Sequence, residues 1–68
     1  MKLEINDVKK LMEIGMIRTT NLGNSKGSTL VFYKGKAFYA WKCNGYICFQ
    51  QKWFWNKKFI FAISDIES

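Results

Sequence analysis

Apolar residues near the start of the chain recur with the period of an α-helix. Ile5, Val8, Leu11 and Met12 fall on one helical face, whereas Lys and Glu side chains occupy the other face. The pattern predicts a short amphipathic helix over residues 6–14. A helix of this length is marginal by itself, so we expect a sheet to hold it.

Residues at both ends of the predicted helix suit capping. Asn6 or Asp7 can cap the first turn, and the carboxylate of Asp7 also suits the positive end of the helix dipole. Gly15 followed by Met16 predicts a left-handed C-terminal cap with its hydrophobic contact. Residues 19–28 are rich in Gly, Ser, Asn and Thr, which predicts a loop.

From Thr29 onward the chain is rich in aromatic and β-branched residues and contains no proline, a composition typical of strands. Three dipeptides with turn chemistry divide this region: Lys34-Gly35, Asn44-Gly45 and Asn56-Lys57. Asn-Gly is the strongest of these hairpin signals, because both of its residues must reach positive φ. We therefore expect a β-meander over residues 29–63, with strands at 29–33, 36–43, 46–55 and 58–63. Residues 64–68 then form a short acidic tail.

Two-residue turns would fix the register and pair Tyr33 with Lys36, Cys43 with Tyr46, and Trp55 with Lys58. Alternation then sorts the strand residues into two faces. We expect the helix to cover the first face, whose members are Leu30, Phe32, Ala37, Tyr39, Trp41, Cys43, Tyr46, Cys48, Gln50, Lys52, Phe54, Phe59, Phe61 and Ile63. The second face interleaves lysines with rings, and it is expected to stay uncovered because one short helix cannot cover both. Its members are Val31, Tyr33, Lys36, Phe38, Ala40, Lys42, Ile47, Phe49, Gln51, Trp53, Trp55, Lys58, Ile60 and Ala62.

These elements predict an α+β fold, a short N-terminal helix packed on a four- or five-stranded antiparallel β-meander. Residues 16–20 would supply the fifth strand, and the sheet would then close into a small barrel. The chain has 68 residues, so residues 1–68 make a single small domain near the lower size limit for folding without disulfides or metals. A homodimer would enlarge so small a core.

Charge is distributed unevenly along the chain. The stretch from Ile14 to Ser64 contains every aromatic residue, eight basic side chains and no acidic residue, within a net charge of +6. A stretch of this composition attracts polyanions and offers them flat rings to stack on. It therefore indicates a class of partner without identifying one.

We expect the second face and the turn beside it to bind that partner through Tyr33, Lys36, Phe38, Lys42, Trp53, Trp55, Lys57 and Lys58. The leading hypothesis is a non-enzymatic nucleic-acid-binding module or small regulator, with DNA or RNA and strandedness left open. The alternative is a small inhibitor or adaptor that docks on an acidic host protein, because Trp, Tyr and Phe with a charged rim also make protein interfaces. The rings could equally pack inside a barrel or a dimer interface.

Other classes of function find little support in the sequence. The chain has no histidine, and no carboxylate lies within the predicted sheet, so we expect neither an enzyme nor a cofactor. Cys43 and Cys48 make at most half of a zinc site and are expected to be small buried hydrophobes. No apolar run is long enough to span a membrane, and the acidic N-terminus does not resemble a signal peptide. We expect a cytoplasmic protein, with a composition typical of small phage or mobile-element proteins.

Overall fold

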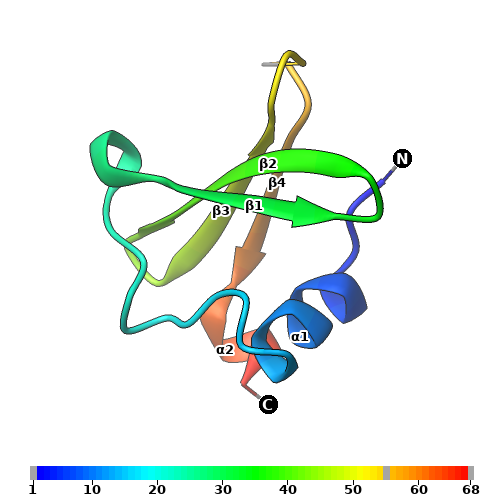
Figure 1. Ribbon diagram of the computed structural model, residues 1–68. Helices are drawn as coiled ribbons and strands as arrows, with labels where there is room; N and C mark the ends of the chain where they lie inside the picture. Colours follow the sequence, from blue (N-terminus) through cyan, green and yellow to red (C-terminus); the bar gives the residue numbers. More distant parts are fainter. Residues whose placement is uncertain (1, 55, 68) are drawn as a thin grey trace.

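Two helices, one short 3₁₀ turn and four strands make up the protein, whose computed structural model describes residues 2–54 and 56–67. Helix α1 (Ile5–Glu13) leads through the 3₁₀ turn η1 (Ser25–Gly27) into the strands β1 (Thr29–Tyr33), β2 (Lys36–Cys43), β3 (Tyr46–Gln51) and β4 (Lys58–Ala62), and α2 (Ile63–Ile66) follows. The strands form one twisted antiparallel sheet in chain order (Figure 1). The predicted α+β fold is confirmed. The sheet is open, and residues 16–20 contain a bend and the start of a turn instead of a fifth strand.

Helix α1 begins one residue earlier than predicted, and its N-cap is Glu4 rather than Asn6 or Asp7. The Asp7 carboxylate acts from inside the first turn, where its Oδ2 accepts a 2.8 Å hydrogen bond from the Glu4 N–H. This contact satisfies a backbone donor and also places a negative charge at the positive end of the helix.

The C-terminal cap of α1 is confirmed. Gly15 has a φ of 78°, and the N–H groups of Met16 and Gly15 donate to the carbonyls of Leu11 and Met12 at 2.9 and 3.1 Å. This double hydrogen bond is the Schellman arrangement. The apolar residue that is buried after the cap is Ile17 and not Met16, which remains 46% exposed.

The first two hairpins have the predicted turns and registers. Tyr33 pairs with Lys36, and Cys43 pairs with Tyr46. Both turn residues have positive φ in each case: 49° and 75° at Lys34 and Gly35, and 47° and 83° at Asn44 and Gly45. These are type I′ turns, whose twist matches that of the flanking strands.

The third hairpin differs from the prediction. Strand β3 ends at Gln51 instead of residue 55, and β4 pairs with it through Gln50 and Lys58. The Phe54 N–H donates to the Gln51 carbonyl at 3.1 Å and so turns the chain away from the sheet. The predicted pair between Trp55 and Lys58 involves a residue outside the described part of the chain. The change of register shifts β4 by an odd number of residues, which exchanges its two faces.

The core lies between the sheet and the two helices. Its buried members are Leu3, Val8, Leu11, Ile17, Leu22, Val31, Phe38, Ala40, Ile47, Phe49 and Ile66, with Phe59 and Phe61 packed against them. Phe38 and Phe49 meet edge to face with their ring centroids 6.5 Å apart, a favourable geometry for aromatic pairs. On β1, β2 and β3 the core is therefore the second face, and the prediction that the helix covers the first face is wrong.

The positions of the lysines on this second face explain why it can be buried. Lys36 is the first residue of β2, and Lys42 is its penultimate residue. Their ammonium groups reach solvent at the rim, while the centre of the face is apolar. In the sequence these lysines alternate with rings, but in the sheet they flank the buried Phe38 and Ala40.

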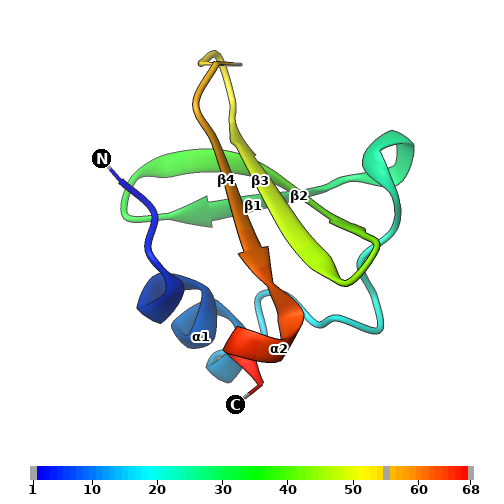
Figure 2. The ribbon, with the colours of Figure 1, turned by 180° about the vertical axis from the view of Figure 1, so that it is seen from behind.

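The C-terminal segment is more than an acidic tail. Residue 63 begins α2 instead of ending β4, and Ile66 is only 6% exposed. Helix α2 lies beside α1 at the end of the sheet (Figure 2).

The loop before β1 is also anchored, because the Lys42 N–H donates to the Gly23 carbonyl at 2.9 Å. Within residues 2–54 and 56–67, no helix is long and apolar enough to cross a membrane.

Candidate binding surface

The sheet face that points away from the core carries an unusual number of rings. We call it the open face, and alternation with the core residues assigns to it Leu30, Phe32, Ala37, Tyr39, Trp41, Cys43, Tyr46, Cys48, Gln50, Ile60 and Ala62. Phe32 and Ile60 are each 63% exposed, and Tyr46 is 49% exposed. An uncovered apolar face of this kind usually marks an interaction surface.

Four rings of the open face follow a path across three strands. Tyr39 and Trp41 are neighbours on the same side of β2, which places them about 7 Å apart. Phe32 on β1 lies diagonally beside Tyr39, because its direct partner is Ala37. Tyr46 on β3 lies diagonally beside Trp41 in the same way, since it pairs with Cys43. We call Phe32, Tyr39, Trp41 and Tyr46 the ring path.

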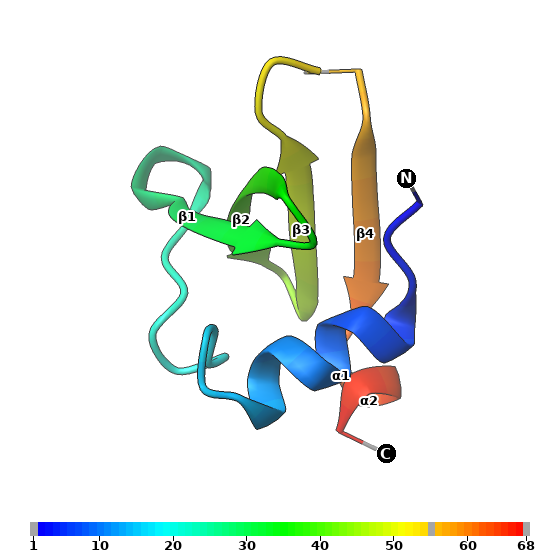
Figure 3. The same cartoon turned by 45° about the vertical axis from the view of Figure 1, so that its right-hand side comes forward.

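The β3–β4 tip, residues 52–54 and 56–58, adds two further exposed rings with lysines over them. Trp53 is 79% exposed and Phe54 is 48% exposed. The Lys52 Nζ lies 4.7 Å from the centroid of the Trp53 ring, and the Lys57 Nζ lies 5.3 Å from that of Phe54. These are cation–π distances. The tip projects from the end of the sheet opposite α1 and α2 (Figures 1 and 3).

Two lysines join the tip to the open face. Lys58 pairs with Gln50, which belongs to the open face. The Lys52 N–H donates to the Ala37 carbonyl at 2.8 Å, which continues the pairing of β2 and β3 by one residue. The Lys52 side chain therefore lies on the same face of the sheet as that of Gln50. The five acidic residues of the chain are Glu4, Asp7, Glu13, Asp65 and Glu67, and none belongs to the open face or the tip.

The predicted site residues do not form one surface. Phe38 is 1% exposed and belongs to the core. Lys42 lies on the helix side of the sheet, where its Nζ donates to the Thr19 carbonyl at 3.1 Å, and Lys36 lies at the rim beside Tyr33. Only the tip residues Trp53, Lys57 and Lys58 lie together on an accessible surface, and Trp55 is outside the described residues.

Tyr33 is held in a structural contact instead of facing a ligand. Its hydroxyl donates a 2.7 Å hydrogen bond to Asp7 Oδ1, and the Lys34 Nζ lies 3.7 Å from the same oxygen. The Glu4 N–H and the Tyr33 hydroxyl, together with Lys34, lower the pKa of Asp7, and the bond to Asp7 raises the pKa of Tyr33. Sequence reasoning grouped the four rings of the ring path correctly on one face of the sheet, but it missed the path because it assigned that face to the core.

The two cysteines line a shallow apolar hollow of about 380 Å³ on the open face, together with Asn44, Tyr46 and Ile60. Both thiols are free, and burial raises the pKa of Cys48. Cys43 is exposed, so the prediction that both cysteines are buried is wrong for this residue. Among the described residues, no group of three or more His, Cys, Asp or Glu side chains could hold a metal ion.

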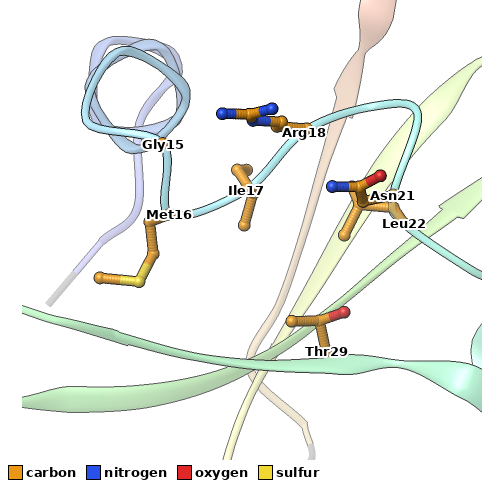
Figure 4. A pocket seen from close by; sticks show the side chains of 7 residues that line it. All are labelled: Gly15, Met16, Ile17, Arg18, Asn21, Leu22 and Thr29. Carbon is orange, nitrogen blue, oxygen red and sulfur yellow. The ribbon is translucent and has the colours of Figure 1, made fainter.

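A second hollow, of about 330 Å³, lies on the other side of the molecule between the end of α1 and the start of β1 (Figure 4). Its lining residues are Gly15, Met16, Ile17, Arg18, Asn21, Leu22 and Thr29. Arg18 brings a positive charge to it, but the C-terminal end of α1 contributes the negative end of the helix dipole. These opposing charges make the hollow a weaker anion site than the tip.

Comparisons of the chain with models of protein families, with curated proteins and with solved structures find no match.

Proposed function

We propose that this protein binds single-stranded nucleic acid on the open face and the β3–β4 tip, and that it acts as a binding module or small regulator without catalysing a reaction. The observation that carries the proposal is the continuity of the two regions. The ring path lies on the face where Lys52 and Lys58 emerge, and no acidic side chain interrupts this surface.

The rings account for a preference for unpaired bases. A base that is not stacked in a duplex can lie on an aromatic side chain, and each such contact contributes about 1–3 kcal/mol. Tyr39 and Trp41 stand on one strand, so two successive bases have neighbouring rings. Stacking tolerates any base, so we expect little sequence preference.

The lysines account for attraction to the phosphates. Lys52, Lys57 and Lys58 gather at one end of the surface, and the net charge of +6 favours association with any polyanion. If these three side chains each neutralise one phosphate, the logarithm of the affinity should fall with the logarithm of salt with a slope of about −2. An increase from 50 to 200 mM salt would then weaken binding by about 20-fold.

Fluorescence anisotropy with a labelled 12-nucleotide single strand, as DNA and as RNA, tests the proposal. The double variant Tyr39→Ala, Trp41→Ala should weaken binding by about 30-fold or more, because two stacking rings are lost. Ile14→Ala with Met16→Ala is the matched control, since it removes exposed apolar side chains that lie outside the surface. Affinity that is absent at low salt, or independent of salt, contradicts the proposal.

An acidic protein partner is the second candidate, and the aliphatic members of the open face favour it. Leu30 is 40% exposed and Ile60 is 63% exposed, and neither offers a ring for a base. Exposed aliphatic side chains beside Trp and Tyr are typical of protein interfaces. The second candidate predicts that one defined acidic protein remains bound after nuclease treatment and competes with the labelled strand for the open face.

A further inference from the structure

We infer that the β3–β4 tip recognises the junction at which a single strand enters a duplex, with the Trp53 indole stacked on the last base pair. This inference rests on the proposed function, because the unpaired strand would lie on the open face. It adds a preferred ligand and assigns the ring path and the tip to different parts of that ligand.

The backbone of Trp53 is the first observation. Its φ is 68°, a left-handed conformation that large side chains rarely adopt and that Gly or Asn adopts more readily. Hydrogen bonds on either side hold the turn, from the Phe54 N–H to the Gln51 carbonyl at 3.1 Å and from the Lys57 N–H to the Phe54 carbonyl at 2.8 Å. Strain of this kind at an exposed residue often accompanies a functional role.

The exposure of the indole is the second observation. Trp53 is 79% exposed, so most of its ring is accessible to a ligand. The Lys52 ammonium stands over the ring at 4.7 Å and can occupy only one of its two faces. The other face is left for a flat apolar partner, and the ammonium adds a positive charge beside it.

The end of a duplex fits this ring better than a single base does. A terminal base pair presents a flat surface wider than one base, and Trp has the largest ring system among the side chains. Phe54 and the Lys57 above it lie next to Trp53, so phosphates that flank the last pair would meet ammonium groups. Apolar side chains that insert between the base steps of a duplex likewise contact the flat faces of base pairs.

The position of the tip is the third observation. Figures 1 and 3 show that the tip lies at the end of the sheet away from α1 and α2, so the helices do not obstruct a duplex there. Lys52 and Lys58 connect the tip with the open face. A strand that leaves the duplex can therefore continue along these lysines toward Tyr39 and Trp41.

Three labelled ligands test the inference at 50 mM salt: a 12-nucleotide single strand, a blunt 12-base-pair duplex, and the same duplex with a 12-nucleotide overhang. We expect the overhang ligand to bind about 5-fold or more tightly than the single strand, the smallest gain that one stacked ring should give. Trp53→Asn removes the indole and keeps a residue that accepts left-handed φ. This variant should abolish the preference, so that the overhang ligand and the single strand bind with equal affinity.

A second measurement reports the contact directly. The fluorescence of 2-aminopurine in the last base pair should change when the native protein binds, and should not change with Trp53→Asn. Tyr39→Ala is the matched control, because it should weaken both the single strand and the overhang ligand to the same extent.

The outcomes separate this inference from the proposed function. Equal affinity for the overhang ligand and the single strand, or an equal loss for both with Trp53→Asn, overturns the junction and leaves single-strand binding intact. Binding to phosphatidylserine vesicles that requires Trp53, without a preference for the overhang ligand, also overturns it and assigns the tip to a lipid surface. Failure to bind any of the three nucleic acids overturns the proposed function itself.

Discussion

The hydroxyl of Tyr33 donates a 2.7 Å hydrogen bond to Oδ1 of Asp7, which joins the end of β1 to the first turn of α1. The same carboxylate accepts the Glu4 N–H through Oδ2, and the Lys34 ammonium lies 3.7 Å from Oδ1. The Asp7 side chain thus caps α1, holds the end of β1 and faces Lys34, which lies in the turn between β1 and β2. The helix is thereby held over the face that it covers.

This arrangement predicts a dependence of stability on pH. The contacts lower the pKa of Asp7 below its ordinary value of 3.8, so the unfolded chain binds the proton more readily than the folded protein. The stabilisation is fully present above pH 3.8 and is lost as the pH falls through the folded pKa. Urea denaturation from pH 6 to pH 2.5 should show the native protein losing its advantage over Asp7→Asn. A constant difference across this range contradicts the prediction.

Tyr33 adds a limit at the opposite end of the pH scale. Its pKa is raised above 10.0 by the bond to Asp7, so its contribution is present below pH 10.0 and is lost as the pH rises through the folded pKa. Tyr33→Phe should therefore lower the urea midpoint at pH 7 and have a smaller effect at high pH. Tyr39→Phe is the control, because the Tyr39 side chain lies on the open face of the sheet, away from the core. This variant should leave the urea midpoint unchanged.

A matched pair of isoleucines tests which face of the sheet is buried. Ile47 is fully buried in the core, whereas Ile60, on the neighbouring strand, is 63% exposed on the open face. Ile47→Val should lower the free energy of unfolding by about 0.5–1.5 kcal/mol, because the lost methyl leaves a cavity. Ile60→Val should change it by less than about 0.5 kcal/mol. Equal effects in chemical denaturation would refute the observed arrangement of the faces.

A pair of glycines tests the turn between β2 and β3. Gly45 has a φ of 83° with open space around its Cα, and Gly27 has no positive φ. Gly45→Ala should destabilise the protein by about 1–2 kcal/mol, because an L side chain strains the left-handed backbone. Gly27→Ala should stay within about 0.5 kcal/mol of the native protein. A thermal melt of the two variants decides the matter, and a harmless Gly45→Ala would mean that the turn is not type I′.

Two pairs of lysines test the electrostatic part of the proposed function. Lys52→Gln with Lys58→Gln removes two charges where the tip meets the open face, and the slope of log affinity against log salt should become shallower by about 1.4. Lys9→Gln with Lys10→Gln removes the same charge from the exposed side of α1. The slope should hardly change in that control. Identical slopes for the two double variants would show that only net charge matters.

The sequence predicted elements and local turns well, and the arrangement of the faces poorly. The Asn44-Gly45 and Lys34-Gly35 turns, with the registers they impose, were read from residue types, because both turns require positive φ within two residues. The Gly15 cap was predictable for the same local reason. The third turn was not, since it depends on a left-handed Trp53, which no residue preference favours.

The sequence by itself determined the helix, the four-stranded meander, two of its three registers, and an acid-free stretch that gives the sheet its charge. It also divided β1, β2 and β3 into the correct two sets of residues. Only the tertiary structure decided which set α1 covers, because both sets are apolar enough to form a core. The choice rests on position: Lys36 and Lys42 lie at the rim of the buried set, where their charges keep contact with water. Burial of Phe38 in turn left Tyr39 and Trp41 on the open face, and moved the candidate surface to the opposite side of the sheet.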